Sequence, residues 1–288
     1  MVLSYGDRAT RGDVAARHRS AHLDEMVDRC RLLFDQVDVM QCEPYSIRDI
    51  SDLVSDLIRE VERPIIDVTC LTKVHTIGVA RACAGAGRRK WRIAYTLPSN
   101  YGASDIQGPW RDTLLVPIGE HPELRRPGHA RGIMLLGNEP TRVMMTMSEL
   151  EPSAGVVVVT SNTLRPDFGG RASDMNADLL AYLAQSSMPD AGLSSGFRVN
   201  DSWRLEGVDL RALDALDVVV GAEIARARVD GAPIVLFPYG PKPVIFGAAY
   251  RLAIDYGKAS WALYTVRDSH SLSYCEGFEE TVWIGHRG

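Results

Sequence analysis

The sequence contains no hydrophobic run long enough to cross a membrane. Its longest apolar stretches are Gly132–Gly137, Val156–Val159 and Pro243–Tyr250, whereas a membrane-spanning helix needs about 20 apolar residues. The first 13 residues are polar, carry charges of both signs and lack the apolar core of a signal peptide. We therefore expect a cytoplasmic protein that does not contact membranes.

An excess of basic residues is also missing. The chain has 32 Lys and Arg against 37 Asp and Glu, which gives a formal net charge of -5. Proteins that bind nucleic acid along a broad surface usually carry a basic excess, so we expect no such general surface here. A small anionic ligand needs only a few local cations, and the net charge does not exclude it.

Several motifs of metal and cofactor chemistry are absent from the sequence. The five cysteines form no C-x-x-C pair, and the seven histidines lack the spacing of metal ligands. The sequence contains no P-loop, no G-x-G-x-x-G and no H-E-x-x-H. Gly192–Gly196 matches G-x-S-x-G, but it lacks the preceding strand and following helix of a nucleophile elbow. We expect reduced thiols, no bound metal and no cofactor.

Short apolar runs alternate with longer helical patterns, which is typical of βαβ units and of a mostly parallel sheet. In the first part of the chain we expect strands at Arg31–Met40, Pro64–Leu71, Trp91–Leu97 and Leu114–Ile118, and helices at Ser46–Glu62, with Ser46 as its N-cap, and His75–Gly85. In the second part we expect strands at Arg131–Leu136, Gly155–Thr160, Ile234–Pro238, Trp261–Val266 and Glu280–Gly285, and helices at Thr141–Leu150, Ser173–Gln185, Leu210–Val229 and Val244–Tyr256.

Two pairs of segments recur in the same order. Gly6–Arg11 and Gly137–Arg142 both read G-x-x-x-T-R. Lys73 and Lys242 each follow an apolar run, with a Gly five residues later and a Tyr-Thr pair 22 residues later. Identical spacing from the lysine to the Tyr-Thr pair predicts one strand–turn–helix–strand unit that is used twice.

We therefore predict an α/β fold with two tandem Rossmann-like three-layer units, mostly parallel sheets and an internal duplication. The first unit spans residues 1–118, a linker spans 119–130, and the second unit spans 131–288. The two motifs lie 67 residues apart in the first unit and 105 in the second. An insertion at about 162–203 in the second unit accounts for the difference.

The repeated lysines point to a ligand. In an open parallel sheet, ligands bind beyond the carboxyl ends of the strands, and both lysines are expected there, at the start of a helix. Helix N-terminal amides and a lysine together favour an anion. A tyrosine on the next strand can stack on a base, and an arginine can bind phosphate through two hydrogen bonds. The candidate ligand-binding residues are Asp67, Thr69, Thr72, Lys73, Tyr95, Gly240, Lys242, Tyr264, Arg11, Arg142, Glu139 and His270.

The stretch from Asp67 to Lys73 reads D-x-T-x-x-x-K directly after a hydrophobic run. It resembles the ligand-binding turn of CARF domains, which are Rossmann-like sensors of cyclic oligonucleotides in prokaryotic antiviral systems. SAVED domains are similar to two CARF-like units fused in one chain. The resemblance implies ligand contacts from Asp67, Thr69 and Lys73.

The second unit departs from this pattern. It keeps Lys242 but has Leu236 and Pro238 where the first unit has the Asp and the Thr. This difference argues against symmetric recognition of a symmetric ligand. CARF and SAVED units are commonly joined to an effector domain, and the two expected units occupy the whole chain. The resemblance therefore implies a separate protein partner that carries an effector activity.

Three functional hypotheses follow. The preferred one is a non-catalytic protein that binds or senses a nucleotide or similar phosphorylated ligand between the two units, in antiviral defence if the resemblance holds. The second is a nucleotide hydrolase or glycosyl-transferring enzyme, in which Asp67, Glu139 or His270 transfers a proton while the lysines hold phosphate. The third is a non-catalytic assembly subunit of a defence complex.

Overall fold

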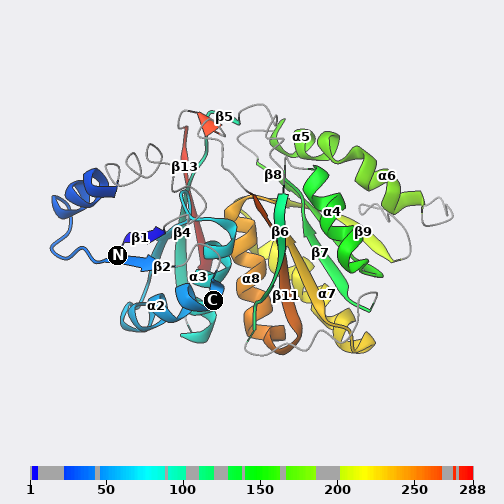
Figure 1. Cartoon of the computed structure of the whole chain (residues 1–288), viewed down its shortest axis with the longest axis horizontal. Helices are drawn as coiled ribbons and strands as arrows, with labels where there is room; N and C mark the ends of the chain where they lie inside the picture. The colour runs from blue at the N-terminus through cyan, green and yellow to red at the C-terminus, as the bar shows by residue number, and fades with distance from the viewer. Residues whose placement is uncertain are drawn as a thin grey trace.

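A computed structural model describes residues 2–5, 23–42, 46–87, 90–101, 110–119, 129–137, 140–162, 167–185, 202–267, 275–276 and 279–287. In this part of the chain, helices combine with mixed parallel and antiparallel sheets, which confirms the α/β class (Figure 1). The strands form a larger sheet in the right half of the view and smaller ones in the left half.

The larger sheet has six strands among the described residues, in the order β6-β11-β10-β7-β8-β9. They are β6 (Trp110–Pro117), β7 (Arg131–Leu135), β8 (Ala154–Ser161), β9 (Trp203–Asp209), β10 (Ile234–Pro238) and β11 (Ser260–Arg267). All neighbours in it are parallel except β6 and β11. From β7 the chain goes outward through β8 to β9, then returns to the other side of β7 through β10 and β11. This is the order of a doubly wound sheet, whose direction of winding reverses between β7 and β10.

Helices cover both faces of the larger sheet. They are α4 (Pro140–Leu150), α5 (Asp167–Met175), α6 (Ala177–Gln185), α7 (Leu213–Asp230) and α8 (Lys242–Tyr256), which a short 3-10 turn, Gly257–Ala259, follows. Successive residues of β7 alternate between two buried clusters: Ile133 and Leu135 pack with α7 and α8, and Met134 packs with α4 and α6. Helices α5 and α6 lie in the segment where the sequence predicts an insertion.

The smaller sheet has the order β13-β4-β3 in the described residues, with β3 (Ile65–Asp67), β4 (Lys90–Thr96) and β13 (Thr281–Arg287). Helices α2 (Ile47–Glu60) and α3 (Lys73–Gly85) belong to this half. Two further pairs are β1 (Val2–Tyr5) with β2 (Val39–Cys42), which is parallel, and β5 (Asn100–Tyr101) with β12 (Cys275–Glu276), which is antiparallel.

Each sheet receives its antiparallel strand from the other half of the chain. After β4, the chain passes through β5 to β6, which pairs with β11 of the larger sheet. After β11, it passes through β12 to β13, which pairs with β4 of the smaller sheet. Strand β6 comes from the predicted first unit and β13 from the second, so both sheets are mixed. The prediction of mostly parallel sheets fits the larger sheet, whereas in the described part of the smaller one β13 is antiparallel and β3 is parallel to β4. The division into units at 1–118 and 131–288 stays a prediction.

One buried core joins the two sheets. It contains side chains of both sheets and of α2, α3, α7 and α8. Helices α3 and α8 lie side by side between the sheets (Figure 1). Trp91 of β4 packs edge-on against Phe246 and Tyr250 of α8, with ring centroids 4.8 and 5.4 Å apart. Burial of these aromatic rings stabilises the contact between the halves.

A glycine lets each central helix approach its outer neighbour. A Cβ on Gly78 of α3 would lie 1.9 Å from Ile50 Cγ2 of α2. A Cβ on Gly247 of α8 would lie 2.9 Å from Leu216 Cδ2 of α7. Both are the glycines five residues after the repeated lysines, and in both helices the missing side chain makes room for the adjacent helix.

The structure also tests individual local predictions. Ser46 is the N-cap of α2, and its Oγ accepts a hydrogen bond from Asp49 N at 3.1 Å, as predicted. The strand predicted at Arg31–Met40 is wrong, because residues 23–31 are helical and β2 begins only at Val39. Leu32, Leu33 and Phe34 in this run are exposed, so the apolar pattern reflects no buried strand.

Candidate functional site

The turn between β3 and α3 is held by its own polar side chains. Asp67 Oδ1 accepts a hydrogen bond from Thr69 N at 2.8 Å, and Thr69 Oγ1 accepts one from Thr96 N at 2.9 Å. Thr72 is the N-cap of α3, and its Oγ1 accepts from His75 N at 3.1 Å. These bonds fix the conformation of the turn at the carboxyl end of β3. They thereby fix the position of Lys73, the first residue of α3.

The turn between β10 and α8 packs tightly against the end of β7. A Cβ on Gly137 would lie 1.9 Å from the carbonyl oxygen of Tyr239, and a Cβ on Gly240 would lie 3.1 Å from Leu135 Cβ. Gly137 is therefore needed for the close approach of these backbones, and a side chain on Gly240 would press tightly on Leu135. Pro241 then leads into α8, whose first residue is Lys242.

The two lysines cross between the turns. Lys73 Nζ donates a hydrogen bond to the carbonyl oxygen of Tyr239 at 3.0 Å and lies 5.3 Å from the centroid of the Tyr239 ring. Lys242 Nζ donates to the carbonyl oxygen of Thr69. We call this arrangement of Lys73, Lys242 and the carbonyls of Thr69 and Tyr239 the lysine seam.

The lysine seam lies at the edge where the starts of α3 and α8 meet. Each helix N-terminus carries a partial positive charge, equivalent to about half an elementary charge. A carbonyl oxygen carries no net charge, so the bonds to the carbonyls of Tyr239 and Thr69 do not neutralise the ammonium groups. Two ammonium groups beside two helix N-termini are groups that attract an anion, so the arrangement can chemically hold one.

A buried polar cluster adjoins the second turn. Tyr239 is almost fully buried, and its hydroxyl donates a hydrogen bond to Thr146 Oγ1 at 3.1 Å. Burial raises the pKa of Tyr239 above its ordinary value, although hydrogen bonds with Thr146 and Thr265 and the charge of Arg142 act in the opposite direction. The hydroxyl therefore stays protonated at neutral pH. Arg142 is itself 5% exposed, so its guanidinium group lies inside this cluster.

The structure brings some of the predicted site residues together. Thr69, Lys73 and Lys242 meet at the lysine seam, Gly240 follows Tyr239 beside it, and Arg142 acts electrostatically on Tyr239. Asp67 and Thr72 shape the first turn. Tyr95 and Tyr264 are both 6% exposed and pack in the core between the sheets, where a ring does not present its face to solvent. Arg11, Glu139 and His270 lie outside the described residues.

Sequence reasoning missed Tyr239 and Asn176. Tyr239 supplies the carbonyl and the ring for Lys73 and a hydroxyl for the buried cluster. Its position three residues before Lys242 is a signal that could have identified it. Asn176, between α5 and α6, donates from Nδ2 to the carbonyl of Gly137 at 2.8 Å and so ties these helices to the β7 turn. No local pattern marks it.

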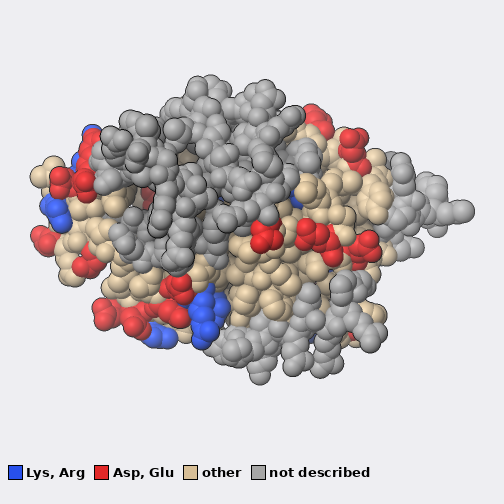
Figure 2. Space-filling view, viewed as in Figure 1, with Lys and Arg blue, Asp and Glu red and all other residues tan. Residues whose placement is uncertain are grey.

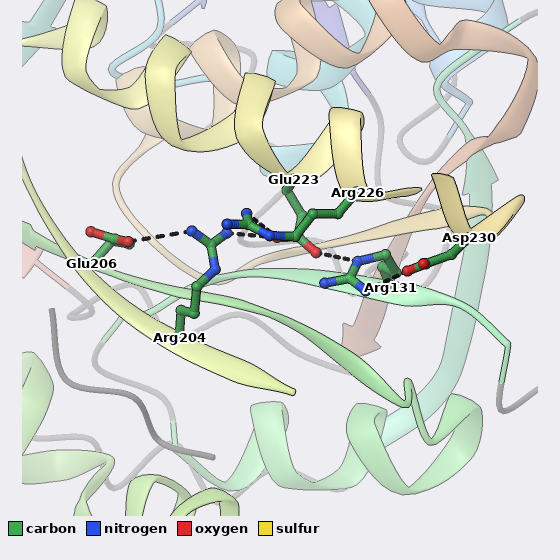
Figure 3. A network of polar contacts seen from close by, with 6 residues as sticks. All are labelled: Arg131, Arg204, Glu206, Glu223, Arg226 and Asp230. Carbon is green, nitrogen blue, oxygen red and sulfur yellow. Dashed lines mark hydrogen bonds and ion pairs between the residues drawn. The ribbon is translucent and has the colours of Figure 1, made fainter. Parts of the chain in front are cut away.

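A second polar cluster lies at the amino end of the larger sheet (Figure 3). The fully buried Glu223 of α7 binds Arg131 Nε at 2.5 Å and Arg204 at 2.7 Å, and Arg226 lies 3.5 Å away. Burial lowers the pKa of Arg131, but the bonds and charges of Glu223 and Asp230 raise it more, and the net shift is upward. Because the arginines are engaged by carboxylates, this cluster holds α7 on the sheet.

No described helix is long and apolar enough to span a membrane. Within the same ranges, no group of three or more His, Cys, Asp or Glu side chains is arranged to hold a metal ion. On the face drawn in Figure 2, acidic side chains are spread over the described surface, whereas basic ones are fewer and lie near its lower middle and at its left end.

No family model, curated protein or solved structure matches this chain.

Proposed function

We propose that the chain is a binding protein for a nucleotide or similar phosphorylated ligand, which it holds at the lysine seam. The observation that carries the proposal is the crossing of Lys73 and Lys242 to the carbonyls of Tyr239 and Thr69. An ammonium group has three N–H donors and no acceptor, so it binds oxygen acceptors. A phosphate oxygen is a stronger, charged acceptor, and it competes well for such donors.

The position of the lysine seam in the larger sheet supports the same proposal. Ligands of doubly wound sheets bind at the carboxyl ends of the strands, where the winding reverses. In this chain the reversal lies between β7 and β10, and Tyr239 and Gly240 directly follow β10. Lys73, from the other half of the chain, reaches this point. A ligand here would contact both halves at once.

We further infer that the two halves arose by internal duplication. The α2-β3-α3-β4 and α7-β10-α8-β11 segments share their order, the lysine at the helix start and the glycine at the helix contact. The antiparallel strands correspond in the same way, since β6 follows the first segment and pairs with β11 of the second, and β13 follows the second segment and pairs with β4 of the first. The turns differ, since the first is built with Asp67 and Thr69 and the second with glycine and proline. A ligand would therefore meet two lysines with unequal surroundings.

The resemblance of Asp67–Lys73 to the CARF turn suggests the first ligands to test, namely cyclic oligonucleotides, and a role in antiviral defence. Under this proposal the protein passes the signal to a separate partner that carries an effector activity.

The proposal is tested by thermal shift with inorganic phosphate, mononucleotides, dinucleotides, cyclic dinucleotides and cyclic oligonucleotides. A ligand at about 100 times its Kd stabilises the folded protein by about 2.7 kcal/mol. We expect a rise in Tm with a nucleotide that is lost in Lys73→Ala and in Lys242→Ala. Lys90→Ala is the matched control, because Lys90 is an exposed lysine at the amino end of β4, whereas the lysine seam lies at the carboxyl ends of the parallel strands.

The same samples separate binding from catalysis. After incubation, the nucleotide is recovered and analysed by chromatography. The proposal expects unchanged nucleotide. Conversion to a product would support the enzyme hypothesis. If none of the nucleotides raises the Tm of wild type, the result opposes both the binding hypothesis and the enzyme hypothesis.

A further inference from the structure

Helix α7 has apolar side chains on two opposite faces. Its inner face packs into the core through Leu213, Leu216, Val220, Ile224 and Ala227. Its outer face carries a second stripe, consisting of Ala215, Val218, Ala222, Ala225 and Val229. Val218 is 72% exposed and Val229 is 87% exposed. A helix on the surface of a globular protein normally presents polar residues there.

The corresponding helix of the other half provides an internal comparison. Helix α2 packs against α3 as α7 packs against α8. Its outward residues are charged and form surface ion pairs, such as Arg48 with Asp52 and Arg59 with Asp56. Since two helices in similar places have such different outer faces, the apolar stripe of α7 is specific to that helix.

The spacing of the stripe is that of a helix–helix contact. Its five residues follow one another at intervals of three, four, three and four, the spacing of a coiled-coil seam. The stripe extends over about 20 Å of the helix. Ala222 and Ala225 occupy its centre, and their small side chains allow the backbone of another helix to approach closely.

The charges beside the stripe favour a second copy of the same helix in antiparallel orientation. Asp214 is exposed in the first turn of α7. Arg228 is exposed in the last turn, where it donates a hydrogen bond to the uncharged carbonyl oxygen of Asp255, and the neighbouring Asp230 is paired with Arg131. An antiparallel pair places the acidic end of each helix beside the basic end of the other, whereas a parallel pair places like charges together. A twofold axis near Ala222 makes the two surfaces identical and the contact closed.

We propose that the chain forms a twofold symmetric dimer through antiparallel packing of the outer α7 stripe. The helix contact alone is smaller than the roughly 1,600 Å² total of a typical stable interface. The dimer is therefore expected to dissociate at micromolar concentration. This proposal does not depend on the ligand at the lysine seam.

The test is sedimentation velocity of the full chain between about 1 and about 100 μM, a range that brackets a micromolar Kd. Wild type is expected to shift from monomer to dimer as concentration rises. Val218→Glu and Val229→Glu are each expected to raise the dimer Kd at least tenfold, since each places a carboxylate in the contact. Arg48→Glu, an equally exposed charge change on α2, is the matched control and should leave the dimer Kd unchanged.

A charge exchange tests the orientation. Asp214→Arg is expected to weaken the dimer, and the double variant Asp214→Arg/Arg228→Asp to restore it. Circular dichroism of every variant confirms that it is folded. Wild type that stays monomeric, including one that binds only a different protein, would overturn the proposal. So would a dimer that is unaffected by both valine substitutions, or a double variant that fails to restore it.

Discussion

Lys73 and Lys242 each extend to the turn from which the other projects. Lys73 bonds to the carbonyl of Tyr239, three residues before Lys242, and Lys242 bonds to the carbonyl of Thr69, four residues before Lys73. The two bonds connect the smaller sheet to the larger one at the edge where parallel strands present ligands. They therefore make the lysines part of the contact between the halves as well as of the proposed binding site.

Lys73→Met and Lys242→Met should each lower the stability of the ligand-free protein slightly. A single hydrogen bond contributes about 0.5–1.5 kcal/mol, so each variant is expected to lose about 1 kcal/mol in urea unfolding. If the bonds hold the two turns jointly, the double variant loses less than the sum of the single losses. Strictly additive losses would show that the two lysines act independently.

Gly78→Ala and Gly85→Ala form a matched pair in helix α3. The new Cβ at residue 78 would lie 1.9 Å from Ile50 Cγ2, whereas the one at residue 85 meets nothing within 4 Å. We expect Gly78→Ala to destabilise the protein by about 1–3 kcal/mol, the usual cost of overpacking. Gly85→Ala should be neutral or stabilising by up to about 1 kcal/mol, because alanine favours the helix. Equal Tm values for the two variants would contradict the close packing of α2 on α3.

Glu223→Gln should be strongly destabilising. Glu223 is fully buried between Arg131 and Arg204, and loss of its charge leaves Arg131 with the carboxylate of Asp230 and Arg204 with the more distant carboxylate of Glu206. Removing one partner of a buried ion pair costs about 3–5 kcal/mol, and we expect about 2–4 kcal/mol here because both arginines are partly exposed. Glu206→Gln is the control, since its half-buried and longer contact with Arg204, at 3.5 Å, contributes at most about 1 kcal/mol. A loss in Glu223→Gln no larger than in the control would contradict this role of Glu223.

Cys83 should make the folded state less stable at alkaline pH. Burial raises the pKa of its thiol from 9.0 to about 12. As the pH rises from about 9 to about 12, the thiol ionises in the unfolded chain but stays protonated in the folded one, so stability falls by up to about 1.4 kcal/mol per pH unit. Urea unfolding across this range should show a shallower decline for Cys83→Ala than for wild type. Identical declines would contradict the raised pKa.

Local structure was predictable where a sequence pattern indicates both the type of element and the residue at which it begins or ends. Ser46 and Asp49 mark the start of α2, and the apolar run at Ile234–Pro238 is a strand that is buried throughout. The strand prediction at Arg31–Met40 was wrong because a short stretch of leucine and phenylalanine fits a strand or a helix end equally well. Its apolar side chains are exposed, which the pattern alone does not reveal.

The arrangement of the strands was less predictable. The run at Leu114–Ile118 indicates a strand, but it does not indicate that the strand pairs with β11 of the other half, because pairing partners depend on the path of the whole chain. The same limit applies to the lysine seam. Lysine spacing predicts that Lys73 and Lys242 lie at equivalent turns, whereas the acceptor carbonyl of Tyr239 follows only from the contact between the halves.

The most direct test of the lysine seam is the Kd of the nucleotide that raises Tm most, measured by calorimetry for wild type, Lys73→Met, Lys242→Met and Lys90→Met. We predict that each of the first two substitutions raises Kd at least about tenfold, which corresponds to about 1.4 kcal/mol of binding free energy. Lys90→Met should bind as wild type does. The same Kd in all four proteins, or no nucleotide binding by wild type, would contradict the proposal that the two lysines hold a phosphorylated ligand.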